Sequence, residues 1–368
     1  MRDFDPALAR TVVCVPARNE QEALPRLLLS LNRQDGASPR DRLRVLVLAN
    51  NCTDDMVARV GLMASDGHVP NLDIRLIEAS LAPEIAHVGT ARRLALDAGA
   101  AWLDEDRIAG GILLSTDADA IAPAGWAKAN VIALEGAELV GGRLLIDEDG
   151  QPSPPGVADL HGRIERYWAS VRRIEDSIDP PPHDPAPRHG DHVAASLGLR
   201  VDLYRAVGGL PALACGEDNA LVSNVRRVGG RVRHCPNVAI RVSARRAGRV
   251  EGGMATEMAR RSRVLTEGEA YCLPPASHWL ALVERRRAWR LAWRSGTAAL
   301  LALGLSVEDL DGIEFETCAN DIALVERLED RFGDAGLPPM TPVPLDIALK
   351  GLDRVLAGLE APARALSA

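Results

Sequence analysis

Aromatic side chains and long apolar runs are both scarce in this sequence. Aromatic residues make up 3% of the chain, although 47% of it is hydrophobic. A buried core must therefore consist mainly of Ala, Val, Leu and Ile, which is typical of parallel strands covered by helices. The longest apolar run, residues 297–305, is far shorter than the roughly 20 residues that a membrane span requires. We expect no segment to cross a bilayer.

Positive charge is not in excess either, since the formal net charge of the 368 residues is -8. A general nucleic-acid-binding protein needs a basic face that displaces counterions from phosphates. We therefore expect no nucleic-acid partner. The length allows one large α/β domain with a C-terminal extension, or two ordinary domains.

The sequence has no CxxC pair and no histidine cluster at the spacing of a zinc site. Its six cysteines are spread over the whole chain: Cys14, Cys52, Cys215, Cys235, Cys272 and Cys318. We expect reduced, mostly buried thiols. The first six residues, MRDFDP, lack the apolar core of a secretory signal. We therefore expect a cytoplasmic protein, and contact with the inner face of the membrane stays open.

Short β-rich runs alternate with helical stretches through the first 150 residues. The runs that we expect to be strands are 11–15, 43–48, 72–77, 112–115 and 139–146, and the expected helices are 22–31, 54–63, 89–103 and 125–134. This alternation predicts right-handed βαβ crossovers and a mostly parallel, Rossmann-like α/β sheet flanked by helices. In such sheets ligands bind beyond the carboxyl ends of the strands.

The later part of the chain differs in composition. Pro-rich stretches at 151–156 and 179–189 flank a predicted helix at 159–174, and long loops of this kind are often functional lids or disordered. Residues 193–242 should complete the sheet, with a helix at 217–227, and residues beyond 252 should be helical only. We expect a domain at 1–252, with a nucleotide-binding half at about 1–150 and an acceptor half at about 151–252. The helical extension should cover 253–368.

Two carboxylates follow the fourth predicted strand, in the run Ser115-Thr116-Asp117-Ala118-Asp119. Side chains two residues apart in an extended chain point the same way, so Asp117 and Asp119 can converge on one cation. Mg²⁺ or Mn²⁺ prefers oxygen ligands and often takes few carboxylates plus substrate phosphates. This position favours a metal site over a solvated turn.

The other strand ends are polar as well. Pro16, Ala17, Arg18 and Glu20 follow the first strand, where they can line a nucleoside pocket or serve only as a helix start capped by Asn19. Two amides, Asn50 and Asn51, follow the second strand and can bind a base or ribose.

Two helix starts complete the set of candidate residues. Arg92 lies at the start of the helix after the third strand, where it either binds a diphosphate or is simply solvated. Asp218 lies at the start of the helix at 217–227. It either stabilises the helix dipole or deprotonates an acceptor hydroxyl.

In this order, these stretches resemble those of family 2 glycosyltransferases with the GT-A fold. The resemblance covers about residues 11–253 and includes the Val207-Gly208-Gly209 turn. It implies a nucleotide-diphosphosugar donor and a hydroxyl acceptor. By this likeness Pro16, Arg18, Glu20 and Asn50 line the nucleotide pocket. Asp119 is the metal ligand with Asp117 nearer the ribose, and Asp218 is the base of an inverting enzyme.

Two departures from the family pattern matter. Members that use uridine donors often have Asp where this chain has Asn50, so the identity of the base is open. The Gln-x-x-Arg-Trp motif of processive polymer synthases is absent, which favours a single addition. In its place residues 243–249 carry three arginines, either an arginine-bearing lid or an exposed basic loop. A retaining transferase and a non-catalytic nucleotide-binding scaffold remain alternatives.

Two further segments carry hypotheses about partners. The loop with His183, His189 and His192 is expected to cover the acceptor side, and a metal site there is less favoured than plain loop histidines. The basic helix at 284–294 has Trp289 and Trp293 at helical spacing. It either contacts an anionic membrane or packs its tryptophans on the protein under arginine stems.

Overall fold

The computed structural model describes residues 8–147, 156–243, 254–311, 313 and 315–365. The chain forms two compact units. The sheet unit comprises residues 1–150, 189–225 and 231–255, and the helical unit comprises 151–188, 226–230 and 256–368. Residues 151–188 therefore group with the C-terminal helices, whereas we had expected them in the acceptor half of the first domain.

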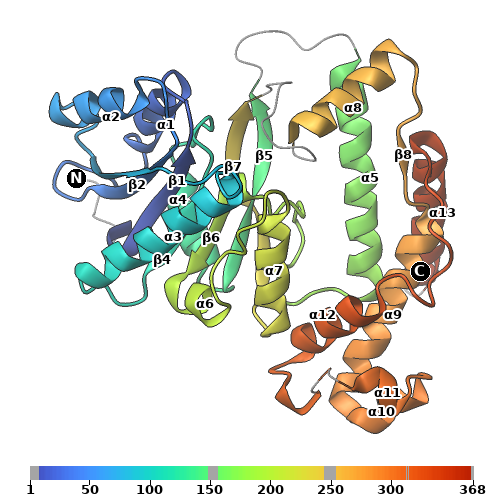
Figure 1. Cartoon of the computed structure of the whole chain (residues 1–368). Coiled ribbons are helices and arrows are strands. Elements are labelled where there is room, and N and C mark those ends of the chain that lie inside the picture. The colour runs from blue at the N-terminus through green and yellow to red at the C-terminus, as the bar shows by residue number, and fades with distance from the viewer. Residues whose placement is uncertain (1–7, 148–155, 244–253, 312, 314, 366–368) are drawn as a thin grey trace. The chain divides into compact units, whose positions relative to one another are not determined.

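The sheet unit contains a seven-stranded sheet in the order β3-β2-β1-β4-β6-β5-β7 (Figure 1). Its strands are β1 (Thr11–Ala17), β2 (Leu43–Asn50), β3 (Leu72–Ala79), β4 (Ile112–Ser115), β5 (Leu139–Asp147), β6 (Leu197–Arg200) and β7 (Val232–Ser243). Strand β6 pairs antiparallel with β4 and β5, and the other pairs are parallel. The expected mostly parallel α/β sheet is confirmed.

Helices cover both faces of this sheet. The helices packed on one face are α1 (Ala23–Leu31), α2 (Met56–Ser65) and α4 (Trp126–Ala133). Those on the other face are α3 (Val88–Glu105), α6 (Val201–Ala206) and α7 (Glu217–Arg227). Alternate residues of β1 point into the two cores, Val13 into one and Val12 into the other. The aliphatic composition of the sequence thus fills two layers of core around one buried sheet.

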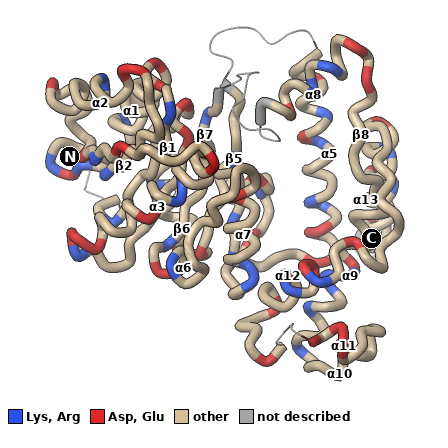
Figure 2. The backbone as a smooth tube through the Cα atoms, in the orientation of Figure 1, with Lys and Arg blue, Asp and Glu red and all other residues tan. Residues whose placement is uncertain are grey.

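The helical unit is built around two helices that pack along each other, α5 (Val157–Ile178) and α13 (Leu345–Ala365). Basic and acidic residues alternate along α5 (Figure 2). The remaining elements are α8 (Met254–Thr266), α9 (Ala276–Ser295), α10 (Thr297–Ala302), α11 (Val307–Leu310) and α12 (Asp321–Phe332), with the two-residue strands β8 (Cys272–Leu273) and β9 (Val343–Pro344). The expectation of helices alone was therefore wrong at this small antiparallel pair.

The Pro-rich segment before residue 189 is held on α5 by one buried arginine. Arg188 donates to the carboxylates of Glu175 (3.0 Å) and Asp176, and its side chain is 4% exposed. It also donates to the main-chain carbonyl of Asp184 (3.3 Å). These bonds replace the secondary structure that the prolines prevent, so this loop is anchored within the helical unit.

Three arginines of the basic helix α9, Arg285, Arg286 and Arg290, are engaged within the helical unit. Arg286 forms a two-pronged pair with Glu329 (2.7 and 2.8 Å), and Arg290 pairs with Asp179 (2.7 Å). Trp289 is buried and lies under the guanidinium of Arg285. Of the two interpretations, packing on the protein is therefore the one observed, and membrane contact finds no support. No helix in the described ranges is both long and apolar enough to span a membrane.

The six cysteines form no disulfide in the structure, and they are less buried than expected. Cys14 and Cys318 are buried and Cys215 is exposed. The other three are half-buried. Burial raises the pKa of the Cys14 thiol well above its ordinary value, which keeps that sulfur an inert part of the core.

Helix α3 crosses β1 so closely at Gly99 that an alanine there would place its Cβ 2.5 Å from Sγ of Cys14. We expect Gly99→Ala to lower the free energy of unfolding by about 1–3 kcal/mol, the usual cost of overpacking a core. Gly61→Ala, on the exposed side of α2 with nothing within 4 Å of the new Cβ, should raise it by about 0.5–1 kcal/mol. Urea unfolding measures both.

The double variant Cys14→Ala/Gly99→Ala should recover part of the loss, because it removes the sulfur from the contact. A Gly99→Ala protein as stable as the wild type would contradict the packing described for α3.

Candidate functional site

The carboxyl ends of β1, β2, β3 and β4 meet at one edge of the sheet, as parallel pairing requires. Strand β6 runs the other way, so the chain enters the sheet at this same edge through Ala194–Ser196. The start of α7 is tied to it as well, because the Ala194 N–H donates to Oδ2 of Asp218 (3.0 Å). The loops predicted to carry chemistry are thus brought together here.

A single buried guanidinium, that of Arg92 in α3, joins these loops. Arg92 is 2% exposed. It donates to Oδ1 of Asp117 (2.6 Å), Oε1 of Glu217 (3.4 Å) and Oγ of Ser115 (2.8 Å). A fourth bond goes to the Ala194 carbonyl (3.2 Å). All three nitrogens of the guanidinium therefore have protein acceptors.

Burial alone would lower the pKa of Arg92. The charge and hydrogen bond of Asp117, followed by the charges of Glu217 and Asp218, outweigh burial and raise the pKa above its ordinary value. Arg92 is a fixed positive charge at the centre of three carboxylates. We had expected it to contact a diphosphate directly, but its observed partners assign it to positioning Asp117 and the start of α7.

The two strand-end carboxylates differ in their surroundings. Asp117 gives one oxygen to Arg92, and its side chain remains 40% exposed. Asp119 is half-buried, and the turn between them is closed by the Ala120 N–H bonded to the Asp117 carbonyl (3.2 Å). Arg92 thus occupies one of the two carboxylate oxygens of Asp117.

The two carboxylates Asp117 and Asp119 suit a cation that takes its remaining ligands from a substrate. Within the described ranges, no group of three or more His, Cys, Asp or Glu side chains is arranged to hold a metal. Mg²⁺ commonly binds through one or two carboxylates plus substrate phosphates. Asp119, with Asp117 beside it, supplies that number of carboxylates.

Two acidic residues open α7, and only one of them is accessible. Glu217 is 6% exposed and lies against Arg92. Asp218 is half-buried and accepts from the Asn219 N–H (2.7 Å) and the Ala194 N–H (3.0 Å). These bonds fix its orientation. Of the two, Asp218 is the more accessible carboxylate.

The expected nucleotide pocket contains one buried polar atom without a partner. Oδ1 of Asn50 has no hydrogen bond in the part of the chain that the structure describes, and the residue is 3% exposed. Leaving a buried amide oxygen unpaired costs roughly 1–3 kcal/mol. A ligand N–H that reached Asn50 would remove this cost, which fits the predicted role.

The other residues predicted for this pocket differ in their exposure to solvent. Pro16 and Ala17 are the last residues of β1, and both are buried. Glu20 is half-buried, and Arg18 is exposed and donates to the Ala86 carbonyl (3.1 Å). Only Arg18 and Glu20 therefore present side chains toward solvent.

Two asparagines in these loops have structural roles instead. Asn51, at φ 49°, exchanges two 2.9 Å hydrogen bonds with the main chain of Leu81. Asn19, at φ 52°, accepts from the Thr53 N–H (2.7 Å). Asparagine tolerates the left-handed backbone region and bonds locally, which explains both positions. We had expected Asn51 to contact a ligand, but its amide instead connects the loop after β2 to the loop after β3.

The start of α3 is covered by protein. The Thr90 N–H donates to Nδ1 of His87 (3.3 Å), which caps the helix. A Cβ on Gly89 would lie 1.9 Å from the Leu213 carbonyl oxygen. The loop before α7 therefore packs directly on this helix start, where we had expected room for a diphosphate.

The histidine loop divides between the two units. His189 and His192 belong to the sheet unit, whereas His183 belongs to the helical unit. His192 bonds to Oδ1 of Asn219 through Nε2 (3.1 Å) and to Nε2 of His234 through Nδ1 (3.1 Å). His192 thus contacts the residue next to Asp218 at the start of α7.

Sequence reasoning missed Glu217, Ser115 and Ala194 as partners of Arg92, and His234 as the partner of His192. Ser115 and Glu217 adjoin the predicted motifs, so they could have been found as neighbours. Ala194 acts only through its main chain and leaves no signal in the sequence. The proposed arginine lid at 243–249 lies outside the described residues beyond Ser243.

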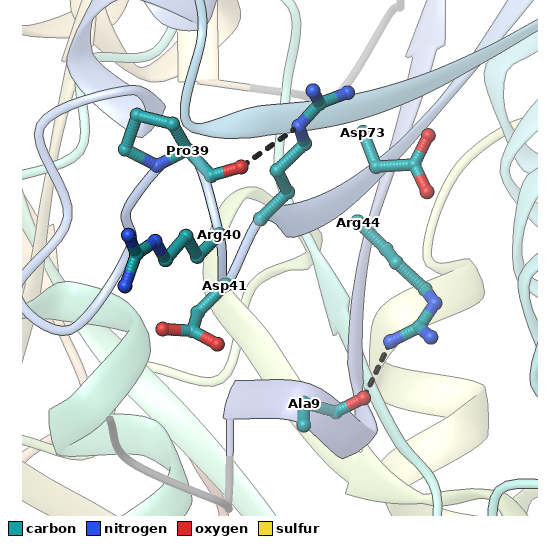
Figure 3. A pocket seen from close by; sticks show the side chains of 7 residues that line it. Ala9, Pro39, Arg40, Asp41, Arg44 and Asp73 are labelled. Atoms are coloured by element: carbon teal, nitrogen blue, oxygen red, sulfur yellow. Dashed lines mark hydrogen bonds between the residues drawn. The ribbon is translucent and has the colours of Figure 1, made fainter.

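One pocket lies away from these residues. A hollow of about 450 Å³ is lined by Ala9, Pro39, Arg40, Asp41, Arg42, Arg44 and Asp73 (Figure 3). Arg44 and Asp73 are paired near the amino ends of β2 and β3, at the edge opposite the candidate site. The guanidinium of Arg44 is held by Asp106 (2.8 Å). The pocket is separate from the candidate site.

No protein-family model matches the sequence, and no curated protein is similar to it. Solved structures with some likeness include a mannosyltransferase from Pyrobaculum calidifontis in complex with GDP-Man and Mn²⁺. It has 18% identity and a TM-score of 0.44, with 88% of this chain and 87% of that chain covered.

Two further structures show a similar level of likeness. TarS (residues 1–349) from S. aureus, in complex with UDP-GlcNAc, has 14% identity and a TM-score of 0.46 over 88% of this chain and 92% of that one. Glucosyl-3-phosphoglycerate synthase from Mycobacterium tuberculosis, with Mn²⁺, UDP and glucosyl-3-phosphoglycerate, has 17% identity and a TM-score of 0.39 over 73% and 86%. Likenesses at this level carry no argument about what this chain binds.

Burial raises the pKa of the Glu217 carboxyl above its ordinary value, and the lowering effect of Arg92 is smaller. A carboxyl with a higher pKa in the folded chain contributes stability at low pH. This stability is lost as the pH rises from the ordinary pKa through the raised one. Glutamine does not titrate. The difference in unfolding free energy between wild type and Glu217→Gln should therefore fall through this window.

Urea unfolding at stepped pH measures this difference. A difference that instead grew with pH would show that the ion pair with Arg92, rather than burial, controls the protonation of Glu217.

Proposed function

We propose that this chain is a glycosyltransferase of the GT-A type that moves a sugar from a nucleotide-diphosphate donor to a hydroxyl acceptor. The reaction takes place at the carboxyl edge of the sheet, depends on Mg²⁺ or Mn²⁺, inverts the anomeric carbon and adds one sugar at a time. The donor nucleotide contacts Asn50, Arg18 and Glu20, with Asp117 near the ribose.

The observation that carries this proposal is the buried Arg92, which holds the strand-end carboxylate Asp117 and the acidic start of α7 in one cluster. Burying an arginine among carboxylates is costly unless every group is paired. A solvated turn and a simple helix cap have no need of such a connection. A transferase does, because the leaving group and the base must be fixed on either side of the reacting carbon.

The roles of the residues follow from their accessibility. Asp119 and Asp117 would hold the cation, which would neutralise the charge that develops on the leaving diphosphate. The acceptor oxygen forms a bond to the anomeric carbon as the bond to the diphosphate oxygen breaks, and that electron pair leaves with the diphosphate. Asp218 takes the proton of the acceptor hydroxyl.

Inversion is favoured because Asp218 offers an accessible carboxylate fixed by two main-chain N–H groups. In a retaining reaction the entering oxygen arrives on the face that the diphosphate leaves. The anomeric configuration of the product, read from the NMR coupling of the anomeric proton, distinguishes the two. Single addition rests on the sequence, which lacks the Gln-x-x-Arg-Trp motif.

The first test is calorimetric titration of UDP, GDP and ADP into the full chain, with and without Mn²⁺. We expect one diphosphate to bind in a Mn²⁺-dependent manner and Asp119→Ala to weaken that binding by at least tenfold, because the variant loses a ligand of the cation. Asp73→Ala is the matched control, since Asp73 lies at the opposite end of the strands. It should bind the nucleotide as the wild type does.

Absence of binding by all three nucleotides would refute the transferase proposal. Asp117 and Asp119 would then be explained as part of an ordinary solvated turn. Nucleotide binding without turnover of any nucleotide sugar would favour the non-catalytic scaffold.

The second test concerns the base. Asp218→Asn should slow release of the nucleoside diphosphate from the matching nucleotide sugar by roughly 10²–10⁴-fold, the usual contribution of a general base. Donor affinity should be unchanged.

Asp202→Asn is the control for this test, because Asp202 also lies in the first turn of a helix and accepts the N–H of the next residue (2.8 Å). If both variants showed the same small decrease in the free energy of unfolding and neither lost activity, Asp218 would only stabilise the helix dipole and would not be the base.

A further inference from the structure

The amide of Asn219 is held in one orientation by side chains to which none of the roles above assigns a task. Asn219 lies in the first turn of α7, directly after Asp218, and it is exposed. Its Oδ1 lies 3.1 Å from Nε2 of His192. Because an amide oxygen can only accept, His192 carries a proton on Nε2 and donates it to Asn219.

A second histidine fixes the ring of His192. Nδ1 of His192 lies 3.1 Å from Nε2 of His234, a residue of β7 that is 6% exposed. With a proton on Nε2, a neutral His192 has a lone pair on Nδ1 that accepts from His234. The main chain is fixed as well, because a Cβ on Gly141 of β5 would lie 2.9 Å from the His192 Cα. His192 is thus held by both strands.

The hydrogen bond from His192 determines where the rest of the Asn219 amide points. With Oδ1 turned to His192, Nδ2 and its two N–H groups face away from that ring. Across the described part of the chain, no protein group accepts from Nδ2 of Asn219. An amide that met only water would need no such support, and fixing a side chain costs conformational entropy. The fixed N–H groups therefore suit an oxygen of a ligand.

Asp218 and Asn219 are oriented by one and the same segment of the chain. Oδ2 of Asp218 accepts from the Ala194 N–H (3.0 Å), and Asn219 is held by His192, two residues earlier. Side chains of consecutive helical residues normally point in different directions. Here both turn toward residues 192–194. A carboxylate and the N–H groups of an amide are therefore neighbours at the start of α7.

This pair of groups matches two adjacent hydroxyls of one molecule. A carboxylate accepts the proton of a hydroxyl, an amide N–H needs an oxygen lone pair, and a hydroxyl offers both. Adjacent hydroxyls occur in sugars and other polyols. An acceptor with one hydroxyl would exclude water from the Asn219 N–H groups without replacing it, which weakens binding.

We propose that the acceptor is a vicinal diol, such as a sugar or another polyol, and that Asn219 determines this preference. One hydroxyl gives its proton to Asp218 as its oxygen bonds to the anomeric carbon, and the diphosphate leaves with the electron pair of the broken bond. The adjacent hydroxyl oxygen accepts from Nδ2 of Asn219. His192 is a positioning residue that acts through Asn219. This inference rests on the proposed function.

The experiment compares two small alcohols of equal size as acceptors, with the nucleotide sugar whose diphosphate binds. Ethylene glycol has two adjacent hydroxyls, and n-propanol has a methyl group in place of one of them. The glycoside formed is quantified by mass spectrometry, which gives kcat/KM per hydroxyl for each alcohol. We expect the wild type to prefer ethylene glycol by about three- to tenfold, the range expected of one hydrogen bond between neutral groups.

Two variants test the part of Asn219 in this preference. Asn219→Asp keeps an oxygen for His192 and removes the Nδ2 donor, whereas Asn219→Ala removes both. In each variant the ratio of the two kcat/KM values should fall to about one, because neither alcohol then meets an N–H donor. Asn224→Ala is the matched control, since it removes an amide from the same helix more than one turn further along. It should keep the wild-type ratio.

His192→Phe separates positioning from general stability. Phenylalanine can keep the contact with the His234 ring but donates no proton to Asn219. It should lower the ratio, and Asn219→Ala/His192→Phe should lower it no further than Asn219→Ala alone, because both changes act on one interaction. A loss of stability alone would change the rates with both alcohols by the same factor and leave the ratio unchanged.

Equal ratios in the wild type, Asn219→Asp and Asn219→Ala would overturn the inference, as would a wild type without a preference for ethylene glycol. Additive effects of Asn219→Ala and His192→Phe would overturn the positioning role of His192. In each of these cases the protein still transfers a sugar, so the proposed function stands. If the wild type released no diphosphate from any nucleotide sugar, with either alcohol or with water, the proposed function and this inference would both be refuted.

Discussion

The architecture of the candidate site depends on one buried positive charge. Arg92 is fully enclosed, yet it bonds to groups from three separate segments of the chain, at the end of β4, before β6 and at the start of α7. A buried guanidinium is stable only when it is paired. The three segments must therefore converge wherever Arg92 is placed, and α3 places it by packing on β1 and β2.

This constraint explains why the two acidic residues of α7 differ. Glu217 turns inward to complete the set around Arg92, and Asp218 is left at the surface with both oxygens oriented by main-chain N–H groups. Glu217 provides charge balance, and in the proposed mechanism Asp218 provides the base. Two adjacent acidic residues thus differ in burial and in their hydrogen-bond partners.

The strands of the sheet could be predicted from the sequence because local patterns of apolar residues determine them. Apolar runs at regular spacing predicted β1 to β5 to within two residues at either end, and Asp117 and Asp119 became candidates because they directly follow such a run. The role of Arg92 was misjudged because burial depends on distant segments. The covering of Gly89 by Leu213 is a contact between residues 124 positions apart, and no local pattern encodes it. Residues 151–188 were likewise assigned to the wrong unit, since tertiary packing alone decides where a helix docks.

The insertion of residues 151–188 between β5 and β6 has a consequence for folding during synthesis. The sheet unit is interrupted by residues 151–188, and β4 finds its second neighbour only in β6, more than 80 residues later. While the chain emerges from the ribosome, β1 to β4 can assemble with their helices, but the outer side of β4 stays an open edge until residue 200 has been made. Open edges invite pairing with other chains. Residues 151–188 therefore lengthen the time during which the edge of β4 in a nascent chain is unpaired and open to aggregation.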